Sequence, residues 1–571
     1  MSLRCICAIV VLASSILPAA FARKLPSSYS LANHGYMIPI KNQGALGTCW
    51  SFSSTTVFET SLVREGLLSV DQASNITSDW DMAVHAGEKV SFTPPYKNWG
   101  AFPQNAIGYL TRGFGRWKLA DFKNPVGGGP VLTTNSPQNA FPLAAGNNGL
   151  DLAPYAPPAN QQLLPFRLVQ VLEFVDTVDG NGKPPSAGFR DRLKEAILEH
   201  GALDTNMNAN NLTGATNTMN TKYDTYAYTG NSLGTDHDVT VIGWNDDVPV
   251  LDNTGRFLGK GAWLIQNSWG TDEFKAKDAV PKPRGCFWLG YCDTAALKYC
   301  CAYVTERRGG VSDTVLQNQI FNYGGANTTS AGSAPGKPTY AAEKLVAQTD
   351  TKLLAIGLWT AADDSAFDID IYSAWGAGGP AGKRLARMHD VVAPNRGYVE
   401  TPLPDSIFLA AGQPVYVVVN FGSHVGKPIA LDTRALKIDG ADFHNITWTS
   451  SDGVHWQDLV GNGKADGVFI MKGIQGGKRV PRNGATLSVT SLSRPLVTAG
   501  TSATLRGVAS SNTARVLWRL GSGPMRRAAG SIATWKIIVH GLKAGRNVVS
   551  IWPATSTGVA TKPVKVTITR S

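Results

Sequence analysis

A change in hydrophobic period near residue 201 constrains the fold more than any other feature of the sequence. Before it, apolar residues recur at helical spacing in three stretches, 50–66, 104–113 and 190–201. After it, apolar residues come in short runs between turn signals, and runs such as HDVTVIGW and PVYVVVNF are typical of β-strands. The sequence therefore predicts a domain of the α+β class, followed by all-β domains.

Length and turn-rich segments divide the chain further. A chain of 571 residues exceeds the size of one domain, and its 60 Gly and 32 Pro favour a loop-rich, β-heavy protein. We predict a signal peptide at 1–22 and an α+β domain at 23–308 that carries a surface insertion at 121–165. A β-sandwich at 309–475 and an immunoglobulin-like β domain at 484–571 would follow.

The first 22 residues have the features of a secretory signal. One Arg precedes an apolar run, and Ala20-Phe21-Ala22 supplies the small residues of a cleavage site. No later run reaches the ~18 apolar residues that a spanning helix needs. The sequence therefore predicts a secreted protein without a transmembrane segment.

The cysteines that remain after the signal are Cys49, Cys286, Cys292, Cys300 and Cys301. An odd number in an exported protein favours a set of disulfides and one free thiol. Cys286 and Cys292 flank a strand-like run whose ends stand roughly 20 Å apart, too far for a bond between them. Each is therefore expected to pair with Cys300 or Cys301, and Cys49 stays free. A zinc site fits export and this spacing less well.

The positive charge of the chain lies in its last part. The net charge is +11, and residues 481–571 hold 13 Lys and Arg but no Asp or Glu. Such a module predicts contact with an anionic surface or polysaccharide, and an idle basic domain is the alternative. Export argues against a nucleic-acid partner.

Cys49 stands where a loop turns into the first predicted helix, with Thr48 as the expected N-cap. A helix N-terminus stabilises negative charge and lowers the pKa of a thiol, which makes the thiol a nucleophile. By itself this position favours a buried core cysteine, so the neighbouring motifs decide.

Three motifs follow one another in a fixed order. They are IPIKNQGALGTCWSFS at 38–53, DHDVTVIGWNDD at 236–247 and GAWLIQNSWG at 261–270. Together they resemble the signatures of the papain-like cysteine peptidases, over about residues 24–305. His237 follows Cys49 by 188 positions, which exceeds the usual spacing in that family, and the insertion accounts for the excess.

The resemblance implies a two-lobed papain-like fold and a catalytic triad of Cys49, His237 and Asn267. Cys49 would attack the scissile carbonyl as a thiolate and form a thioester. His237 would form an ion pair with the thiolate, protonate the leaving amine and later activate water, while Asn267 would orient the imidazole ring. No metal and no organic cofactor is implied.

The family pattern also assigns supporting residues. Gln43 and the backbone N–H of Cys49 would donate to the oxyanion. Trp50 follows the nucleophile, and Trp269 would shelter the imidazole hydrogen bond from water. Gly100 is expected in the substrate pocket.

Three features depart from the family pattern. Leu46 stands where many relatives have a second cysteine, so the helical lobe is expected to hold together without that bridge. Asp238 follows the catalytic histidine in place of a small apolar residue, and with Asn206 it would line the pocket for the second substrate side chain upstream of the cut. This implies a polar, base-preferring pocket, with a local salt bridge of Asp238 as the alternative. A blocking pro-segment is not expected, so the enzyme would be active once folded or gated by a later domain.

The predicted β-sandwich carries a second resemblance. Residues 315–475, with runs such as IFLAAGQPVYVVVNF, resemble the lectin-like domain that follows the catalytic domain in a bacterial subset of the family. A sugar-binding module and a structural spacer are both open. Protein or peptide substrates are expected. The alternatives are a Cys-His amidase acting on cell-wall peptides and an adhesin whose catalytic lobe is inactive.

Overall fold

The structure is a computed structural model that describes residues 25–44, 47–74, 76–77, 79, 82, 101–112, 164–176, 182–210, 212, 218–231, 234–276, 278–307, 315–318, 328–331, 337–393, 395–422, 428–432, 444–460, 468–476, 487–489, 496–509, 515–521, 526–530, 535–555, 558–559 and 563–570. The predicted signal at 1–22, Leu46, Gly100 and all but the last two residues of the insertion at 121–165 lie outside these ranges.

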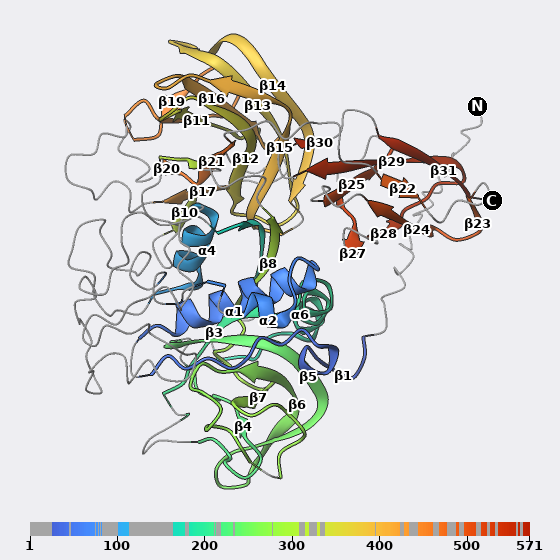
Figure 1. Ribbon diagram of the computed structural model, residues 1–571. Helices are drawn as coiled ribbons and strands as arrows, with labels where there is room; N and C mark the ends of the chain where they lie inside the picture. Colours follow the sequence, from blue (N-terminus) through green and yellow to red (C-terminus); the bar gives the residue numbers. More distant parts are fainter. Residues whose placement is uncertain are drawn as a thin grey trace, which may run out of the picture.

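The three predicted helices are all present, in the middle of the molecule (Figure 1). They are α1 (Cys49–Arg64), α4 (Pro103–Arg112) and α6 (Ala187–His200), and the structure adds α2 (Val70–Ala73) and a 3-10 turn, η1 (Ala32–His34). α1 is buried along almost its whole length because it contacts β5 and β8 on one side and α4 on another. Ser61 Oγ donates to the Tyr303 carbonyl at 2.9 Å and fixes the helix to the sheet.

The first domain is built on a mostly antiparallel sheet in the order β2-β8-β3-β5-β6-β7-β4. The strands are β2 (Phe166–Val175), β8 (Tyr299–Arg307), β3 (Leu203–Met207), β5 (His237–Leu251), β6 (Phe257–Gln266), β7 (Cys286–Gly290) and β4 (Thr225–Tyr226), with β1 (Ser28–Ser30) beside β5.

Alternate residues of these strands face two apolar clusters, as the two-residue period of a strand requires. On β8, Tyr303 lies in the cluster that contains Phe58 of α1, whereas Ala302 and Val304 lie in the cluster that contains Leu193 of α6. The sheet is therefore covered by α1 on one face and by α6 on the other.

The sheet continues into the second domain without a break in strand pairing. β15 pairs with β2 at Val399 and Gln170, and the order runs on as β15-β12-β17-β10. These strands are β15 (Gly397–Leu409), β12 (Thr351–Thr360), β17 (Ile429–Asp432) and β10 (Thr328–Ala331), joined by β21 (Met471–Gly476), β9 (Val315–Leu316) and β20 (Val468–Phe469). The pattern of apolar residues along the chain does not predict that the two domains share one sheet.

A second sheet completes the sandwich of this domain in the order β14-β13-β16-β11-β18-β19. Its strands are β14 (Gly379–Ala393), β13 (Ser365–Gly376), β16 (Pro414–Asn420), β11 (Tyr340–Val346), β18 (Thr447–Ser450) and β19 (Gln457–Asp458). Side chains of both sheets, such as Ile356 of β12 and Ile369 of β13, meet in one buried core.

Buried polar contacts hold the two domains together. Arg167 of β2 and Glu400 of β15 form an ion pair at 2.8 Å, with side chains 5% and 1% exposed. Trp359 Nε1 of β12 donates to Glu173 of β2 at 3.3 Å. Since burial makes an unpaired charge costly, these pairs favour a single relative placement of the domains.

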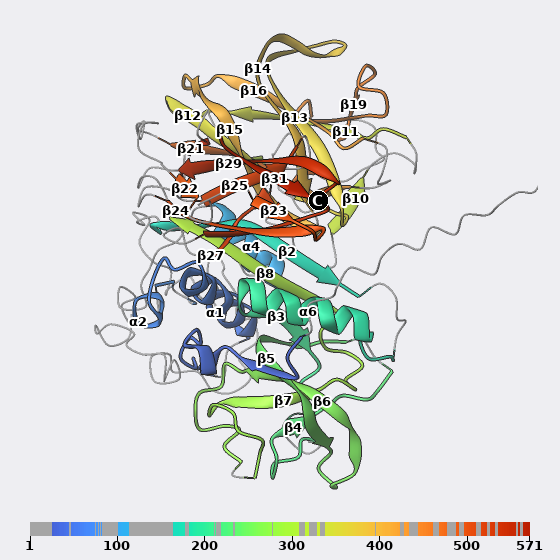
Figure 2. The ribbon, with the colours of Figure 1, turned by 90° about the vertical axis from the view of Figure 1, so that its right-hand side faces the viewer.

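The last residues form a separate sandwich of two sheets around a core that includes Leu505, Trp518, Trp535 and Ile551. One sheet holds β22 (Leu487–Val489), β24 (Ser502–Ala509), β28 (Trp535–His540) and β27 (Ala529–Gly530). The other holds β23 (Leu496–Thr498), β31 (Val564–Arg570), β29 (Gly545–Thr555), β25 (Arg515–Leu520) and β26 (Arg526–Arg527), with β30 (Gly558–Val559) beside β29. Figure 2 shows this module over the second domain, where β30 contacts β15. Its immunoglobulin-like topology stays a prediction.

The expected disulfides are not formed, because all five cysteines that the structure describes are free thiols. Cys286 lies on β7, and Cys300 and Cys301 lie on β8, with β3, β5 and β6 between them. At about 4.8 Å per strand the separation is roughly 19 Å, and a disulfide needs Cα atoms within about 7 Å. Cys292 packs beside Gly259 and Gly290 at the end of β7. The predicted disulfides were wrong because the spacing of cysteines along the chain does not reveal the order of the strands in the sheet.

A buried charge cluster links the segment before Gln43 to α1. Lys41 Nζ lies 3.1 Å from Glu59 Oε2 of α1 and 3.0 Å from Asp79 Oδ1, and it donates to Thr55 Oγ1 at 3.0 Å. The three charged side chains are at most 4% exposed. This cluster ties the segment before Gln43 and Asp79 to α1.

Candidate active site

Cys49 is the first residue of α1 and is half-buried. Its sulfur accepts hydrogen bonds from the backbone N–H groups of Trp50 and Asp238, so the helix end and the start of β5 converge on the thiol. The expected cap is not formed: the Thr48 side chain makes no capping hydrogen bond, and its carbonyl accepts from Ser51 at 3.0 Å. Trp50 is fully buried in the apolar cluster around α1.

His237 opens β5, and Asn267 directly follows β6, so neighbouring strands bring the two side chains together. His237 Nε2 lies 2.7 Å from Asn267 Oδ1, which also accepts the backbone N–H of Ser268 at 2.8 Å. Because an atom that accepts a backbone N–H must be the amide oxygen, Nε2 carries the proton. Nδ1 is then the ring nitrogen with a free lone pair in the neutral imidazole.

Trp269, which the resemblance expects to shelter this hydrogen bond, lies against the His237 ring. Its ring lies 4.9 Å from the His237 ring at an angle of 31°, and it stacks at 6.0 Å on Phe274. His237 is 6% exposed and Asn267 2%. Exclusion of water strengthens the bond between them.

Gln43 lies against the same turn. Its backbone N–H donates to the Ser268 carbonyl at 2.8 Å, and its Oε1 accepts from Ser268 Oγ at 2.5 Å. The carboxamide is thereby oriented with Nε2 directed away from Ser268. Sequence reasoning did not assign this role to Ser268, although the residue stands inside the Asn-Ser-Trp-Gly motif.

Burial of the thiol and the imidazole acts against the expected ion pair. The pKa of the Cys49 thiol is raised to about 12, first by burial and then by the negative charge of Asp238, against the hydrogen bonds that lower it. Burial lowers the pKa of His237, against the hydrogen bond to Asn267 that raises it. Burial thus favours the neutral form of both groups, against the effect of the helix N-terminus on the thiol.

The two residues that were predicted to share a pocket are in contact. Asp238 and Asn206 are partners in the pairing of β5 with β3, and Asn206 Nδ2 donates to Asp238 Oδ1 at 2.9 Å. Asp238 Oδ2 is buried and has no hydrogen-bond partner among the described residues. Burial and the nearby Asp204 raise the pKa of Asp238 well above its usual value, and no cation of the described chain offsets them.

Asp204 is the polar residue beneath the site that sequence reasoning missed. It accepts hydrogen bonds from Ser53 at 2.6 Å, from Ser54, and from the Tyr303 hydroxyl at 3.3 Å. Burial raises its pKa to about 6. A run of Ser and Thr on a helix that is otherwise apolar was the available signal, since buried hydroxyls need polar partners.

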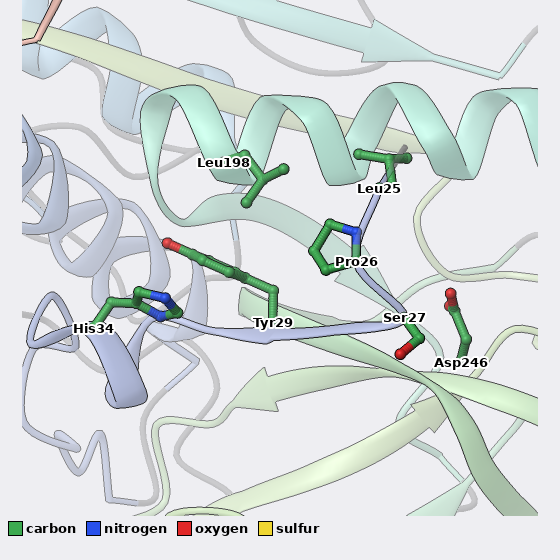
Figure 3. A pocket seen from close by; sticks show the side chains of 7 residues that line it. All are labelled: Leu25, Pro26, Ser27, Tyr29, His34, Leu198 and Asp246. Atoms are coloured by element: carbon green, nitrogen blue, oxygen red, sulfur yellow. The ribbon is translucent and has the colours of Figure 1, made fainter. Parts of the chain in front are cut away.

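A hollow of about 680 Å³ lies elsewhere, where the N-terminal strand crosses β5 and α6. Figure 3 shows Pro26, Tyr29 and Asp246 around it. Asp246 is nine residues along β5 from His237, roughly 30 Å at 3.3 Å per residue. This hollow is therefore not part of the catalytic group.

Within the described ranges, no three His, Cys, Asp or Glu side chains are grouped as a metal site would require. Over the same ranges, no helix combines the length and apolar character of a membrane span.

Known families match two parts of the chain. The model of the papain family cysteine protease matches residues 136–276, a range that includes His237 and Asn267 and begins after Cys49, and the model of the lectin-like domain matches residues 320–474. One part of the chain thus matches the papain family of cysteine proteases, and a later part matches the lectin-like domain.

Individual curated proteins match less than half of the chain. The chain is 23% identical to cathepsin K of Mus musculus over 43% of this chain and 56% of that protein, and 21% identical to cysteine proteinase 1 of Dictyostelium discoideum over 44% and 59%. It therefore spans just over half the length of these curated relatives.

Among solved structures, the fold is similar to the cysteine protease and lectin-like domains of Cwp84, a surface layer associated protein of Clostridium difficile. The TM-score is 0.58 at 19% identity, covering 80% of this chain and 90% of that one. A structure of the same clostridial protease after propeptide cleavage gives a TM-score of 0.56 at 20% identity, with coverage of 79% and 100%.

Proposed function

We propose that the protein is a secreted cysteine endopeptidase that cleaves peptide bonds through Cys49, His237 and Asn267. The main support is the hydrogen bond of 2.7 Å between His237 Nε2 and Asn267 Oδ1. Asp238, the residue after His237, donates its backbone N–H to the Cys49 sulfur. A thiol, an imidazole of fixed tautomer and a buried amide thus occupy one place, as thioester chemistry requires. The match to the papain family supports the same reaction.

The first half-reaction begins from neutral groups. His237 Nδ1 accepts the thiol proton as the sulfur bonds to the carbonyl carbon, and the carbonyl π electrons move to oxygen. The Cys49 N–H and the Gln43 amide, held by Ser268, donate to this oxyanion. When the carbon–nitrogen bond breaks, Nδ1–H gives its proton to the leaving amine.

The second half-reaction reverses these roles. A water molecule loses a proton to His237 Nδ1 while its oxygen bonds to the thioester carbon. The carbon–sulfur bond then breaks, the sulfur regains the proton from the imidazole, and the acid product leaves. Asn267 keeps the ring oriented through both steps.

Active-site titration tests this proposal. An epoxide-type thiol inhibitor is expected to add once per molecule, read by intact mass, and Cys49→Ala is expected to abolish the addition. Cys292→Ala is the matched control, because Cys292 is the other half-buried thiol. If the folded wild-type protein takes up no inhibitor, the proposal fails and the adhesin interpretation replaces it.

The pocket at Asp238 and Asn206 gives the peptidase a preference for a basic side chain at the second position upstream of the cut. The support is Asp238 Oδ2, which is buried without a partner, and the absence of a nearby cation in the described chain. A substrate guanidinium or ammonium would supply both the hydrogen bond and the charge that this carboxylate lacks.

Peptides that differ only at this position test the preference. We expect kcat/KM for Arg to exceed that for Leu by about ten-fold or more, since one well-placed charge pair contributes about 1.4 kcal/mol. Asp238→Asn keeps an acceptor for Asn206 and is expected to remove the preference. A clear preference of the wild type for Leu or Phe contradicts the assignment, and inhibitor titration shows separately whether the site is competent.

The terminal module binds an anionic polymer or surface outside the cell. Its 13 basic residues have no acidic neighbour within residues 481–571, and Lys543 and Arg546 are exposed. On a heparin column, Lys543→Glu with Arg546→Glu is expected to elute at lower salt than the wild type, and Lys260→Glu, exposed in the first domain, is expected to change elution little. Wild-type retention that does not respond to salt contradicts the electrostatic mechanism.

A further inference from the structure

The outer sheet of the lectin-like domain carries a group of aromatic side chains that the proposed peptidase does not use. We name it the aromatic platform and define it as Tyr372, Trp375, Tyr416, Trp448 and Trp456. The residues come from β13, β16, β18 and the position before β19. In Figures 1 and 2 this sheet forms the end of the molecule opposite β4 and β7.

The platform lies on the face that turns away from the domain core. The inward residues of the same strands, such as Ile371 and Val417, are fully buried between the two sheets. Tyr372 stands opposite Tyr416, and Ala342 stands opposite Trp448, so these side chains share the other face. Apart from Trp448, the platform residues keep part of their surface exposed.

The rings form an ordered stack. Trp375 lies 4.3 Å from Trp448 with 24° between the planes, and 5.7 Å from Tyr416 with 25°. Trp456 stands edge-on to Trp375 at 5.1 Å and 74°. Ala342, which is 0% exposed, packs against these rings from below. Because its side chain is only a methyl group, the surface under the rings is flat.

The turn between β13 and β14 is shaped to keep this stack. Gly379 has φ +107°, and a Cβ there would come within 2.3 Å of the Trp456 ring. Glycine is therefore required both for the backbone and for the ring contact. The hairpin that carries Trp375 thus closes directly against Trp456.

Oriented polar groups stand at the edges of the platform. On one side Arg387 donates to both oxygens of Asp370 at 2.6 Å, two residues from Tyr372. On the other side His455 Nδ1 lies 2.7 Å from Asp452 Oδ2, next to Trp456. Asp370 and Asp452 therefore each have a basic side chain as partner.

These features define the ligand chemistry. Exposed ring surfaces in a contiguous group mark an interaction site. The platform offers flat faces with polar groups around them, so its ligand is flat and apolar on one face and rich in hydroxyl groups at its edge. A pyranose ring has this form, since its C–H bonds make an apolar face and its hydroxyls surround it. We propose that the platform binds a neutral glycan, with a sugar ring stacked on Trp375 and hydroxyls bonded to the Arg387–Asp370 and His455–Asp452 pairs.

Calorimetric titration of the full chain with two hexasaccharides, of β-linked N-acetylglucosamine and of β-linked glucose, tests the proposal. We expect the wild type to bind at least one of them, Trp375→Ala to weaken that association at least ten-fold, and Trp375→Tyr to restore most of it. Phe408→Ala is the matched control, because Phe408 is 58% exposed on β15 of the other sheet, and it is expected to bind like the wild type.

Two results would overturn the proposal. One is a wild type that binds neither hexasaccharide, and if it then binds a proline-rich peptide, the platform is a peptide surface instead. The other is equal binding by Trp375→Ala and Phe408→Ala. Inhibitor titration at Cys49 is expected to be unchanged in all these variants, so failure here leaves the proposed peptidase untouched.

Discussion

Replacing Lys41 by Met tests whether the buried charge cluster holds the segment before Gln43 in place. Met fills most of the volume of the lysine stem, so the change removes the charge rather than the packing. It leaves Glu59 and Asp79 as buried acids, 0% and 4% exposed, without their common cation. Breaking a buried ion pair from one side costs about 3–5 kcal/mol, and we expect a loss of unfolding free energy of that size at pH 8.

The pH dependence of this loss follows from Glu59. Burial raises the pKa of Glu59 to about 7 even though Lys41 lowers it, and removal of Lys41 raises it further. A carboxyl whose folded pKa lies above its unfolded value of 4.5 is favourable when protonated, and its stability is lost as pH rises through the folded pKa. Because one pKa unit corresponds to about 1.4 kcal/mol, the loss in Lys41→Met is expected to be at least about 1 kcal/mol smaller at pH 5 than at pH 8.

Urea unfolding at both pH values measures the two losses, and inhibitor titration reports whether Cys49 still reacts. Lys260→Met is the matched control, since Lys260 pairs with Asp247 at 2.7 Å while both side chains are more than 60% exposed. An exposed pair contributes about 0–1 kcal/mol. The reasoning is refuted if both variants lose the same amount, or if the loss in Lys41→Met is the same at pH 5 and pH 8.

Three further outcomes are expected. Burial raises the pKa of Glu173 to about 7, so ionisation of this carboxyl lowers the stability of the protein as pH rises from about 5 to 8. Glu173→Gln is expected to remove up to ~3 kcal/mol of this pH dependence of stability. Thermal unfolding of the variant and the wild type across this pH range measures the difference. Gly397→Ala places a Cβ 2.2 Å from the Val171 carbonyl oxygen and is expected to separate the unfolding of the first two domains into two transitions. Gly412 also has a positive φ, +78° against +127° at Gly397, but a Cβ there meets open space, so Gly412→Ala is expected to leave one transition. Thiol counting in denaturant without reductant is expected to find five free thiols in the chain that lacks residues 1–22, and fewer would restore the disulfide prediction.

The elements nearest to the chemistry could be predicted from the sequence. α1 and α6 were recognisable from helical spacing, and Gly201 ends α6 as expected. β5 and β6 were recognisable because buried central strands are continuous apolar runs. The motif order therefore anticipated the contact between His237 and Asn267, which depends only on two neighbouring strands.

The features that could not be predicted depend on which residues lie close together in space, and the order of residues along the chain does not give this. The disulfide prediction failed because β7 and β8 are close in sequence but separated by three strands. The expectation of a lowered thiol pKa did not allow for burial of the Cys49 thiol, which is the largest effect on its pKa, or for the smaller effects of Asp238 and Asp204 from neighbouring strands. Both features depend on which segments pack together in the fold.

The shared sheet sets how the two proposed activities are related in space. From β15 the order runs through β2, β8 and β3 to β5, the strand that begins with His237. A flexible linker would leave the two domains free to rotate, but Arg167 and Glu400 form a buried pair across this joint and Lys472 Nζ donates to Thr111 Oγ1 of α4 at 2.8 Å. A glycan held on the aromatic platform would therefore fix the direction of the catalytic site as well as its distance, so anchoring would select which peptide bonds near that glycan the thiol can reach.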